Sequence, residues 1–226
     1  MIFKRFIKQI GQDKWQTLKQ KKVLVIGLGG VGGHAIESLV RSGIHHLILI
    51  DYDRIELTNI NRQIIAHHDN LNQLKTNAWQ QRIKQINPDC HVTLINEHLN
   101  KDNFYLLDNY QFDYLIDACD SLFTKQLLIK YASDNKIKII SSMGMGNKLD
   151  PSKITITKLS KTINDPLAKK LRKFVKDNHL KDIPVVASNE IPIKNTNEFI
   201  TSNAFVPAIS GILMASFIIN DIIKHT

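Results

Sequence analysis

Short apolar runs alternate with longer amphipathic stretches over the first 150 residues. Runs of four or five apolar residues predict buried strands, and apolar positions that recur every three or four residues predict helices. We expect strands at 23–26, 46–50, 92–96, 114–118 and 138–142, and helices at 4–20, 33–42, 73–86 and 124–135. Because strands and helices alternate, the pattern predicts an α/β protein with a Rossmann-like, doubly wound, mostly parallel sheet.

The rhythm changes after Asp150 and Pro151, where antiparallel additions to the sheet are expected. The pattern predicts an antiparallel strand at 154–159, a polar helix at 166–178 and a short strand at 184–188. The lysine-rich stretch between about 160 and 200 is expected to be a mobile insertion.

The tail at 205–223 is apolar over 19 residues, and two interpretations are open. The length is sufficient for a membrane span. Pro207, Gly211 and Asp221 interrupt the apolar run, and such interruptions favour a helix packed inside the protein or at a subunit interface. Membrane association is therefore the less favoured interpretation.

Positive charge is unevenly distributed along the chain. Lys and Arg outnumber Asp and Glu by 30 to 21, which gives a formal net charge of +9. Residues 1–22 contain seven basic residues against one acid, and 158–181 contain eight against two. These stretches are either solvated helix faces or a surface for a polyanion such as nucleic acid.

Cysteine usage restricts the class of protein. Cys90 and Cys119 are the two cysteines, and neither belongs to a CxxC pair. This excludes a disulfide framework and a four-cysteine zinc site. The first residues contain no apolar run long enough for a signal peptide, so we expect a cytoplasmic location.

A glycine-rich loop, GLGGVGG, lies between the first predicted strand and the following helix. Gly27, Gly29 and Gly32 satisfy the GxGxxG pattern, and with Gly30 they let the backbone turn tightly and approach a phosphate. Asp51, at the end of the next strand, is placed to accept hydrogen bonds from ribose hydroxyls. The loop predicts adenosine binding, but it serves NAD and ATP equally well.

Polar and charged residues follow other predicted strands at the edge where open α/β sheets bind ligands. They are Asn59, Arg62 and Gln63 in DYDRIELTNINRQ, Lys75 near a predicted helix start, and Asp120 after the fourth strand. Cationic groups at that edge suit a triphosphate, and a carboxylate suits Mg²⁺. Taken singly, Arg62 or Lys75 is more often a surface charge, but the set favours ATP over NAD.

These motifs resemble those of the adenylating enzymes related to MoeB, ThiF and ubiquitin-activating enzymes. The matching pieces are GLGGVG, DYDRIELTNINRQ, Lys75, INPD and DACDS, and the match covers nearly the whole chain. The resemblance implies one ThiF-like adenylating domain over 1–226. In it, 1–150 is the nucleotide-binding part, and 151–226 is the substrate-side segment with a C-terminal packing helix.

The same resemblance implies that ATP activates a substrate carboxylate as an acyl-adenylate. Gly27, Gly29, Gly30 and Gly32 would hold the nucleotide, Asp51 the ribose, Asn59, Arg62, Gln63 and Lys75 the phosphates, and Asp120 the Mg²⁺. Arg62, Lys75 and Asp120 are the expected catalytic residues, because neutralising charge on the leaving pyrophosphate lowers the barrier to attack.

Two further segments, KLSKTINDPLAKKLRK and VVASNE, are similar to signatures of the tRNA threonylcarbamoyladenosine dehydratase (TcdA or CsdL) branch. Members of that branch adenylate the threonyl carboxylate of the modified adenosine, and its carbamoyl group then closes a ring with net loss of water. The resemblance implies a tRNA substrate, with candidate contacts at Lys161, Lys169, Lys170 and Arg172. Thr162, Asp165 and Lys169 either close over the substrate or cap and solvate a helix.

The chain departs from these relatives in its cysteines, its N-terminus and its length. It lacks the CxxC zinc pairs of MoeB- and ThiF-like members and the thioester cysteine of ubiquitin-activating enzymes, and Cys119 is interpreted as a small buried residue. Lys8 stands where many relatives have an arginine that reaches the partner subunit's ATP, and Arg5 is a candidate substitute. The chain is also shorter than expected between about 180 and 205. The resemblance further implies a homodimer and a cysteine-desulfurase partner for sulfur transfer.

Other functions stay open at this point. One is adenylation of the C-terminus of a small ubiquitin-like sulfur-carrier protein, although the missing zinc pairs count against it. The others are a non-catalytic nucleotide-binding or sulfur-relay protein and a dehydrogenase. No nicotinamide slot or proton relay is indicated for the last.

Overall fold

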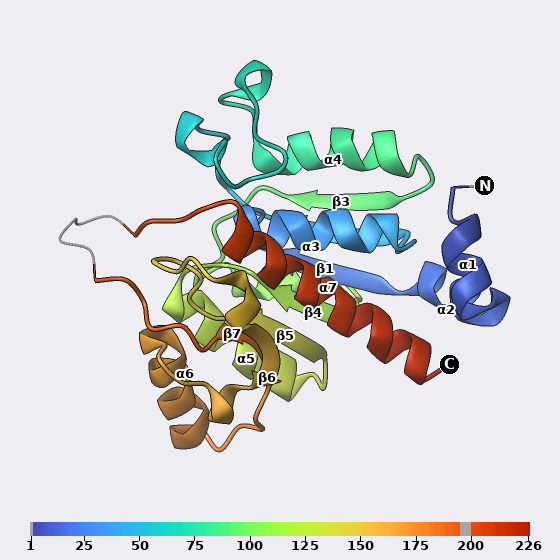
Figure 1. Ribbon diagram of the computed structural model, residues 1–226. Coiled ribbons are helices and arrows are strands. Elements are labelled where there is room, and N and C mark those ends of the chain that lie inside the picture. Colours follow the sequence, from blue (N-terminus) through green and yellow to red (C-terminus); the bar gives the residue numbers. More distant parts are fainter. Residues whose placement is uncertain (1, 195–199) are drawn as a thin grey trace.

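The computed structural model describes residues 2–194 and 200–226, and its strands form one seven-stranded sheet in the order β3-β2-β1-β4-β5-β7-β6 (Figure 1). The strands are β1 (Lys22–Ile26), β2 (His46–Ile50), β3 (His91–Ile95), β4 (Tyr114–Asp117), β5 (Lys138–Ser142), β6 (Ile154–Lys158) and β7 (Pro184–Ser188). All neighbouring strands run parallel except β6 and β7, which pair antiparallel. The predicted sheet is therefore confirmed, with one antiparallel pair as its C-terminal addition.

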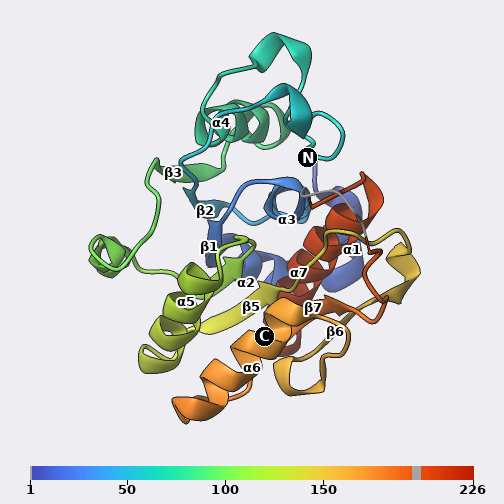
Figure 2. The same cartoon turned by 90° about the vertical axis from the view of Figure 1, so that its left-hand side faces the viewer.

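Helices pack on both faces of this sheet (Figure 2). The helices are α1 (Lys4–Ile10), α2 (Gln12–Gln20), α3 (Gly30–Arg41), α4 (Lys75–Ile86), α5 (Leu122–Asp134), α6 (Pro166–Asp177) and α7 (Phe205–Lys224). Short 3₁₀ turns are η1 (Leu57–Asn59), η2 (His68–Asn70), η3 (Phe104–Asn109), η4 (Pro151–Lys153) and η5 (Leu159–Lys161). Helices α3, α4 and α7 share one hydrophobic cluster with the sheet, and α5 and α6 share the other, so the sheet is doubly wound.

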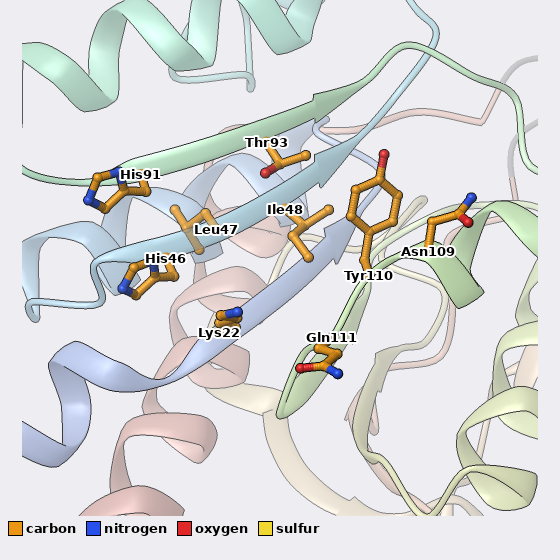
Figure 3. Close-up of a pocket in the computed structure, with 9 residues that line it drawn as sticks. All are labelled: Lys22, His46, Leu47, Ile48, His91, Thr93, Asn109, Tyr110 and Gln111. Atoms are coloured by element: carbon orange, nitrogen blue, oxygen red, sulfur yellow. The ribbon is translucent and has the colours of Figure 1, made fainter.

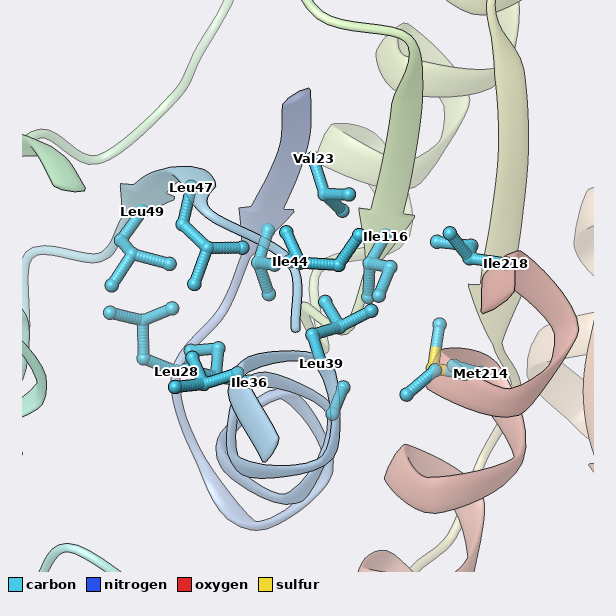
Figure 4. Close-up of a cluster of buried hydrophobic side chains, with 14 of the residues drawn as sticks. Val23, Leu28, Ile36, Leu39, Ile44, Leu47, Leu49, Ile116, Met214 and Ile218 are labelled. Carbon is cyan, nitrogen blue, oxygen red and sulfur yellow. The ribbon is translucent and has the colours of Figure 1, made fainter. Parts of the chain in front are cut away.

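Side chains of the central strands point alternately to the two faces of the sheet, so these strands contribute to both hydrophobic clusters. Leu47 and Leu49 of β2 belong to the α3 side, whereas Ile48 and Ile50 belong to the α5 side. Figure 4 shows Leu47 and Leu49 at one end of this cluster, near Ile36 of α3, and Met214 and Ile218 of α7 at the other end. Because successive side chains of a strand point to opposite faces, an uninterrupted apolar run is what a strand buried on both faces requires.

Two expectations about the chain were wrong. The single helix expected at 4–20 is two helices, because Gly11 adopts φ +91° and breaks the helix between α1 and α2. The stretch expected to be a mobile insertion contributes α6 and β7 to the fold, and β7 lies inside the sheet between β5 and β6. Residues 195–199, the end of that stretch, lie outside the described residues.

Helix α7 is, among the described residues, the one helix long and apolar enough to cross a membrane by length and composition. Half of its most apolar window is buried inside the protein, and it packs closely on α3. At Gly211 an added Cβ would lie 2.1 Å from the carbonyl oxygen of Val31 and 2.8 Å from the nitrogen of Ala35. The interpretation as a packing helix agrees with this contact.

We expect Gly211→Ala to destabilise the protein, although alanine favours an isolated helix over glycine by about 1 kcal/mol. The added methyl group has no room against the α3 backbone, and overpacking of this kind costs about 1–3 kcal/mol. Urea unfolding measures the change, with Ser216→Ala on the less buried side of α7 as the control. Equal or higher stability of the Gly211 variant would contradict the close packing.

Candidate nucleotide-activating site

The glycine loop turns so tightly that side chains are excluded at two of its positions. Gly27 has φ +83°, and a Cβ there would lie 2.7 Å from the carbonyl oxygen of Ala118. A Cβ on Gly32 would lie 1.8 Å from the carbonyl oxygen of Gly27. Gly29 and Gly30 begin α3, and the nearest atom to a Cβ on Gly29 is Gln63 Nε2, at 3.6 Å. Gly27 and Gly32 therefore shape the turn, whereas Gly29 stands at the helix N-terminus, where a phosphate is attracted.

Asp51 holds this loop from the end of β2. Its Oδ2 accepts a hydrogen bond from the Leu28 N–H at 2.6 Å, and its Oδ1 accepts from the Asp53 N–H at 2.8 Å. Burial raises the pKa of the Asp51 carboxyl, and the neighbouring Lys75 opposes that shift. A carboxylate offers about four acceptor positions, so Asp51 can hold the loop and still accept from ribose hydroxyls.

Lys75 lies at the first turn of α4, where its side chain is buried. Its Nζ donates to Asp53 Oδ2 at 2.6 Å, while Asp53 itself is half-exposed. A buried ammonium needs such a partner. The structure thus places one positive charge beside the two carboxylates that follow β2.

The end of η1 and the segment after it bring Asn59, Arg62 and Gln63 toward the same loop. Asn59 is buried and its Oδ1 accepts from the Glu56 N–H. The Arg62 guanidinium donates to the Thr58 carbonyl at 2.9 Å, and the Arg62 side chain borders Gly30. Gln63 is buried beside Gly29, and its Oε1 has no hydrogen-bond partner.

An unpartnered buried amide oxygen is costly in a finished fold. A ligand hydroxyl or a water bound to Mg²⁺ can satisfy the Gln63 oxygen. The amide lies against the start of α3, where the helix N-terminus attracts a phosphate.

Asp120 is exposed just beyond β4. Burial raises the pKa of Tyr52, and the carboxylates of Asp53, Asp120 and Asp51 add to that shift, so Asp120 faces the same edge as the carboxylates after β2. In residues 2–194 and 200–226, no group of three or more His, Cys, Asp or Glu could hold a metal ion. Mg²⁺ usually binds one or two carboxylates together with substrate phosphates, so the donor set fits that ion.

A buried ion pair beneath this edge was not predicted from the sequence. Lys125 of α5 is fully buried, and its Nζ lies 3.0 Å from both carboxylate oxygens of Asp117. Ser141 Oγ donates to the same carboxylate at 2.5 Å. Asp117 and Lys125 are eight positions apart in the sequence, and no local sequence motif predicts that they form an ion pair.

Cys119 contacts the same carboxylate, and its Sγ donates to Asp117 Oδ1 at 3.0 Å. Burial and the nearby Asp117 carboxylate raise the pKa of its thiol well above the usual range. Cys119 as a whole residue is only partly buried, so the interpretation as a small buried residue holds only in part.

The signature segment at 158–173 is anchored by its polar residues. Asp165 caps α6, with its Oδ1 accepting from the Ala168 N–H at 2.9 Å. Thr162 is buried, and Arg172 donates to both its carbonyl oxygen and its hydroxyl. The capping interpretation is therefore confirmed for Asp165. Arg172 is engaged within the segment, while Lys161, Lys169 and Lys170 are exposed.

Arg5 and Lys8 lie far from this chain's own glycine loop. Both are exposed on α1, beside the amino-terminal ends of the strands, whereas the loop lies at the carboxyl-terminal ends (Figure 1). Neither reaches the nucleotide site of the same chain.

The fold and this edge are those of a nucleotide-binding type of α/β protein, with a glycine loop at a helix N-terminus, a buried carboxylate after β2 and cationic side chains nearby. A sequence model of the ThiF family matches residues 3–225, and the chain belongs to that family.

Its relatives include tRNA threonylcarbamoyladenosine dehydratases. The chain is 36% identical over 233 residues to that of Bacillus subtilis (strain 168), with 95% of this chain and 92% of the relative aligned. It is 42% identical over 166 residues to that of Escherichia coli (strain K12), with 74% and 62% aligned. The fold is similar to the crystal structure of E. coli TcdA in complex with ATP, with a TM-score of 0.92, 34% identity and coverage of 99% and 94%.

We expect Lys75→Met to weaken ATP binding by about 10- to 100-fold, as loss of a charged hydrogen bond to phosphate does. The fold should persist, because the Asp53 carboxylate left behind is half-exposed and can be hydrated. Titration calorimetry measures the affinity, and Lys84→Met on the exposed face of α4 is the matched control. Unchanged affinity in the Lys75 variant would exclude Lys75 from the phosphate site.

Proposed function

We propose that this protein dehydrates threonylcarbamoyladenosine in tRNA, using ATP to adenylate the threonyl carboxylate. The observation that carries the proposal is the attachment of the signature segment to the nucleotide edge. Asp165 Oδ2 accepts from the Gly144 N–H at 2.8 Å, two residues after β5, and β5 pairs with the strand that leads to Asp120. The likeness to relatives of that name supports the same substrate.

In this proposal, the chain acts as one ThiF-like adenylating domain. Residues 1–150 bind the nucleotide, and 151–226 provide the substrate-side segment and the packing helix α7. Asp51 orients the ribose, while Arg62, Lys75 and the N-terminus of α3 neutralise the phosphates. Asp120 would hold Mg²⁺, which supplies further positive charge to the leaving pyrophosphate.

The reaction has two steps with balanced products. A carboxylate oxygen of the substrate attacks the α-phosphorus of ATP, and the bond to pyrophosphate breaks. The carbamoyl group of the same nucleotide then attacks the activated carbonyl carbon, and AMP leaves with the carboxylate oxygen. Because the nucleophile belongs to the substrate, proximity replaces a nucleophile from the enzyme.

The state of the two thiols supports ring closure without a cysteine. Burial raises the pKa of Cys90 to about 12, and burial also raises that of Cys119. A thiolate is the reactive form, and the raised pKa of both thiols disfavours it. The family resemblance also suggests a cysteine desulfurase as a partner for sulfur transfer.

We also propose a cytoplasmic homodimer. Helix α7 has an outer apolar stripe that includes Phe205 and Ile212, both exposed in the single chain. Arg5 and Lys8 lie at the opposite end of the sheet from their own nucleotide site, so a phosphate contact by either requires a second chain. Burial of the α7 stripe against a second copy would remove apolar surface from water.

The decisive experiment is incubation with ATP, Mg²⁺ and tRNA that carries threonylcarbamoyladenosine. Nucleoside mass spectrometry should show loss of one water from the modified nucleoside and release of AMP. Asp120→Asn should stay folded and lose this activity, because the carboxylate charge that would hold Mg²⁺ is removed. If the mass of the modified nucleoside stays unchanged after incubation with the wild-type protein, the proposal is refuted. Full activity of Asp120→Asn would refute the role of Asp120 in metal binding.

Binding of tRNA should depend on the exposed lysines of α6. We expect the double variant Lys169→Glu, Lys170→Glu to bind tRNA more weakly and with a smaller salt dependence, by about one unit of slope for each phosphate that is no longer neutralised. Filter binding at several salt concentrations measures both quantities. Lys84→Glu with Lys101→Glu changes the net charge equally at exposed sites elsewhere. Identical slopes for the two double variants would leave α6 as a solvated helix face.

A further inference from the structure

A cavity opens on the sheet away from the glycine loop (Figure 3). Its volume is about 330 Å³, at the lower end of the range for small-ligand pockets. Its walls come from β1, β2, β3 and the segment after η3. The lining residues are Lys22, His46, Leu47, Ile48, His91, Thr93, Asn109, Tyr110 and Gln111.

The two ends of this cavity differ in chemistry. Lys22, His46 and His91 gather at the amino-terminal ends of three adjacent strands, whereas Tyr110 and Asn109 stand at the other end (Figure 3). Ile48 and Thr93 lie between the two ends. The lining set contains three basic side chains and no carboxylate.

The histidine pair is held in place by strand register. His46 and His91 are direct partners in the parallel pairing of β2 and β3, and their rings stack with centroids 5.2 Å apart and planes 11° from parallel. Partial burial lowers the pKa of His46, and the positive neighbours His91, Lys22 and His45 lower it further. Two imidazoles fixed in contact repel once both are protonated, and a bound anion relieves that repulsion.

The nearby carboxylate before β4 already accepts hydrogen bonds from other groups. Asp113, before β4, accepts from Lys21 Nζ at 2.8 Å and from the Lys22 N–H at 2.9 Å. Its carboxylate is thus satisfied by Lys21 and by backbone. The Lys22 side chain is exposed, and none of the ion pairs within the described residues includes it.

We propose that this cavity binds one nucleotide unit, with its phosphate against Lys22, His46 and His91 and its base near Tyr110. The base would lie over Ile48 and Thr93, where the ring of Tyr110 offers a stacking surface and the amides of Asn109 and Gln111 offer hydrogen bonds. The phosphate belongs either to a free nucleotide or to RNA; the RNA source rests on the proposed function, whereas the site itself does not.

The test follows histidine resonances by NMR during titration with three probes: uridine 5′-monophosphate, the dinucleotide UpU and uridine. Both phosphate-bearing probes should shift the resonances of His46 and His91 saturably, and uridine should bind at least about tenfold more weakly, as loss of a charged hydrogen bond predicts. UpU should bind more tightly at pH 5 than at pH 8, because its phosphodiester keeps its charge over this range while protonation of imidazole at the lower pH adds positive charge to the site. Tighter binding of UpU than of the mononucleotide would identify RNA as the source, and the reverse order a free nucleotide.

The variant Lys22→Gln, His91→Gln changes two exposed side chains and should abolish the preference for phosphate-bearing probes. Lys84→Gln on α4 is the control. Affinity for ATP should be unchanged in both variants, which separates this site from the glycine loop. Equal binding of uridine and its monophosphate, or undiminished binding of UpU by the double variant, would overturn the proposal.

Discussion

Three backbone segments come into close contact at the glycine loop, and the placement of the nucleotide site depends on these contacts. Gly32 lies against the carbonyl oxygen of Gly27, and Gly27 in turn lies against the backbone of Ala118. The first contact brings the N-terminus of α3 directly onto the end of β1, and the second brings the end of β4 onto the loop. A helix N-terminus, a ribose carboxylate and Asp120 can meet at one place only because these backbones approach without side chains between them. Gly211 continues the arrangement on the far side of α3, where α7 packs on the helix backbone.

Buried ion pairs hold the helices and strands that surround the glycine loop. Lys125 and Asp117 tie α5 to β4, and Lys148 lies 3.8 Å from Asp165 at the start of α6. The second pair holds Gly144 from both sides, because Lys148 Nζ donates to its carbonyl at 2.7 Å and Asp165 accepts from its N–H. Burial lowers the pKa of Lys148, while Asp165 and Glu190 oppose that shift.

Such pairs add little net stability, because removing the charges from water costs about as much as their attraction returns. Their value in this fold is positional. Each stands within a few residues of a group proposed to meet ATP or the substrate, and neither can move without leaving a charge unpaired in the interior.

The sequence predicted the sheet well because its central strands are buried on both faces and therefore consist of nearly uninterrupted apolar runs. It also located the residues that follow β1, β2 and β4, since the edge of a parallel sheet follows from strand order. The prediction from sequence failed where the structure depends on the conformation of one residue or on a partner that is distant in the sequence. The positive φ of Gly11 divides one amphipathic pattern into two helices, and the partner of Lys125 is set by how α5 lies on β4. The proposed nucleotide cavity was equally hidden, because His46 and His91 are 45 positions apart and meet only through strand register.

The structure also divides the basic residues into those that are paired with acids and those that are not, a division that the net charge of +9 does not reveal. Several are paired with acids, as Lys21 is with Asp113 and Lys138 is with Asp221. The exposed lysines of α6 take part in none of the ion pairs within the described residues; they are Lys169, Lys170, Lys173 and Lys176. Lys173 lies three positions from both Lys170 and Lys176 and four from Lys169, and like charges at these spacings on a helix repel and destabilise it. A bound polyanion would remove that repulsion. The proposed contact between α6 and tRNA would relieve this repulsion.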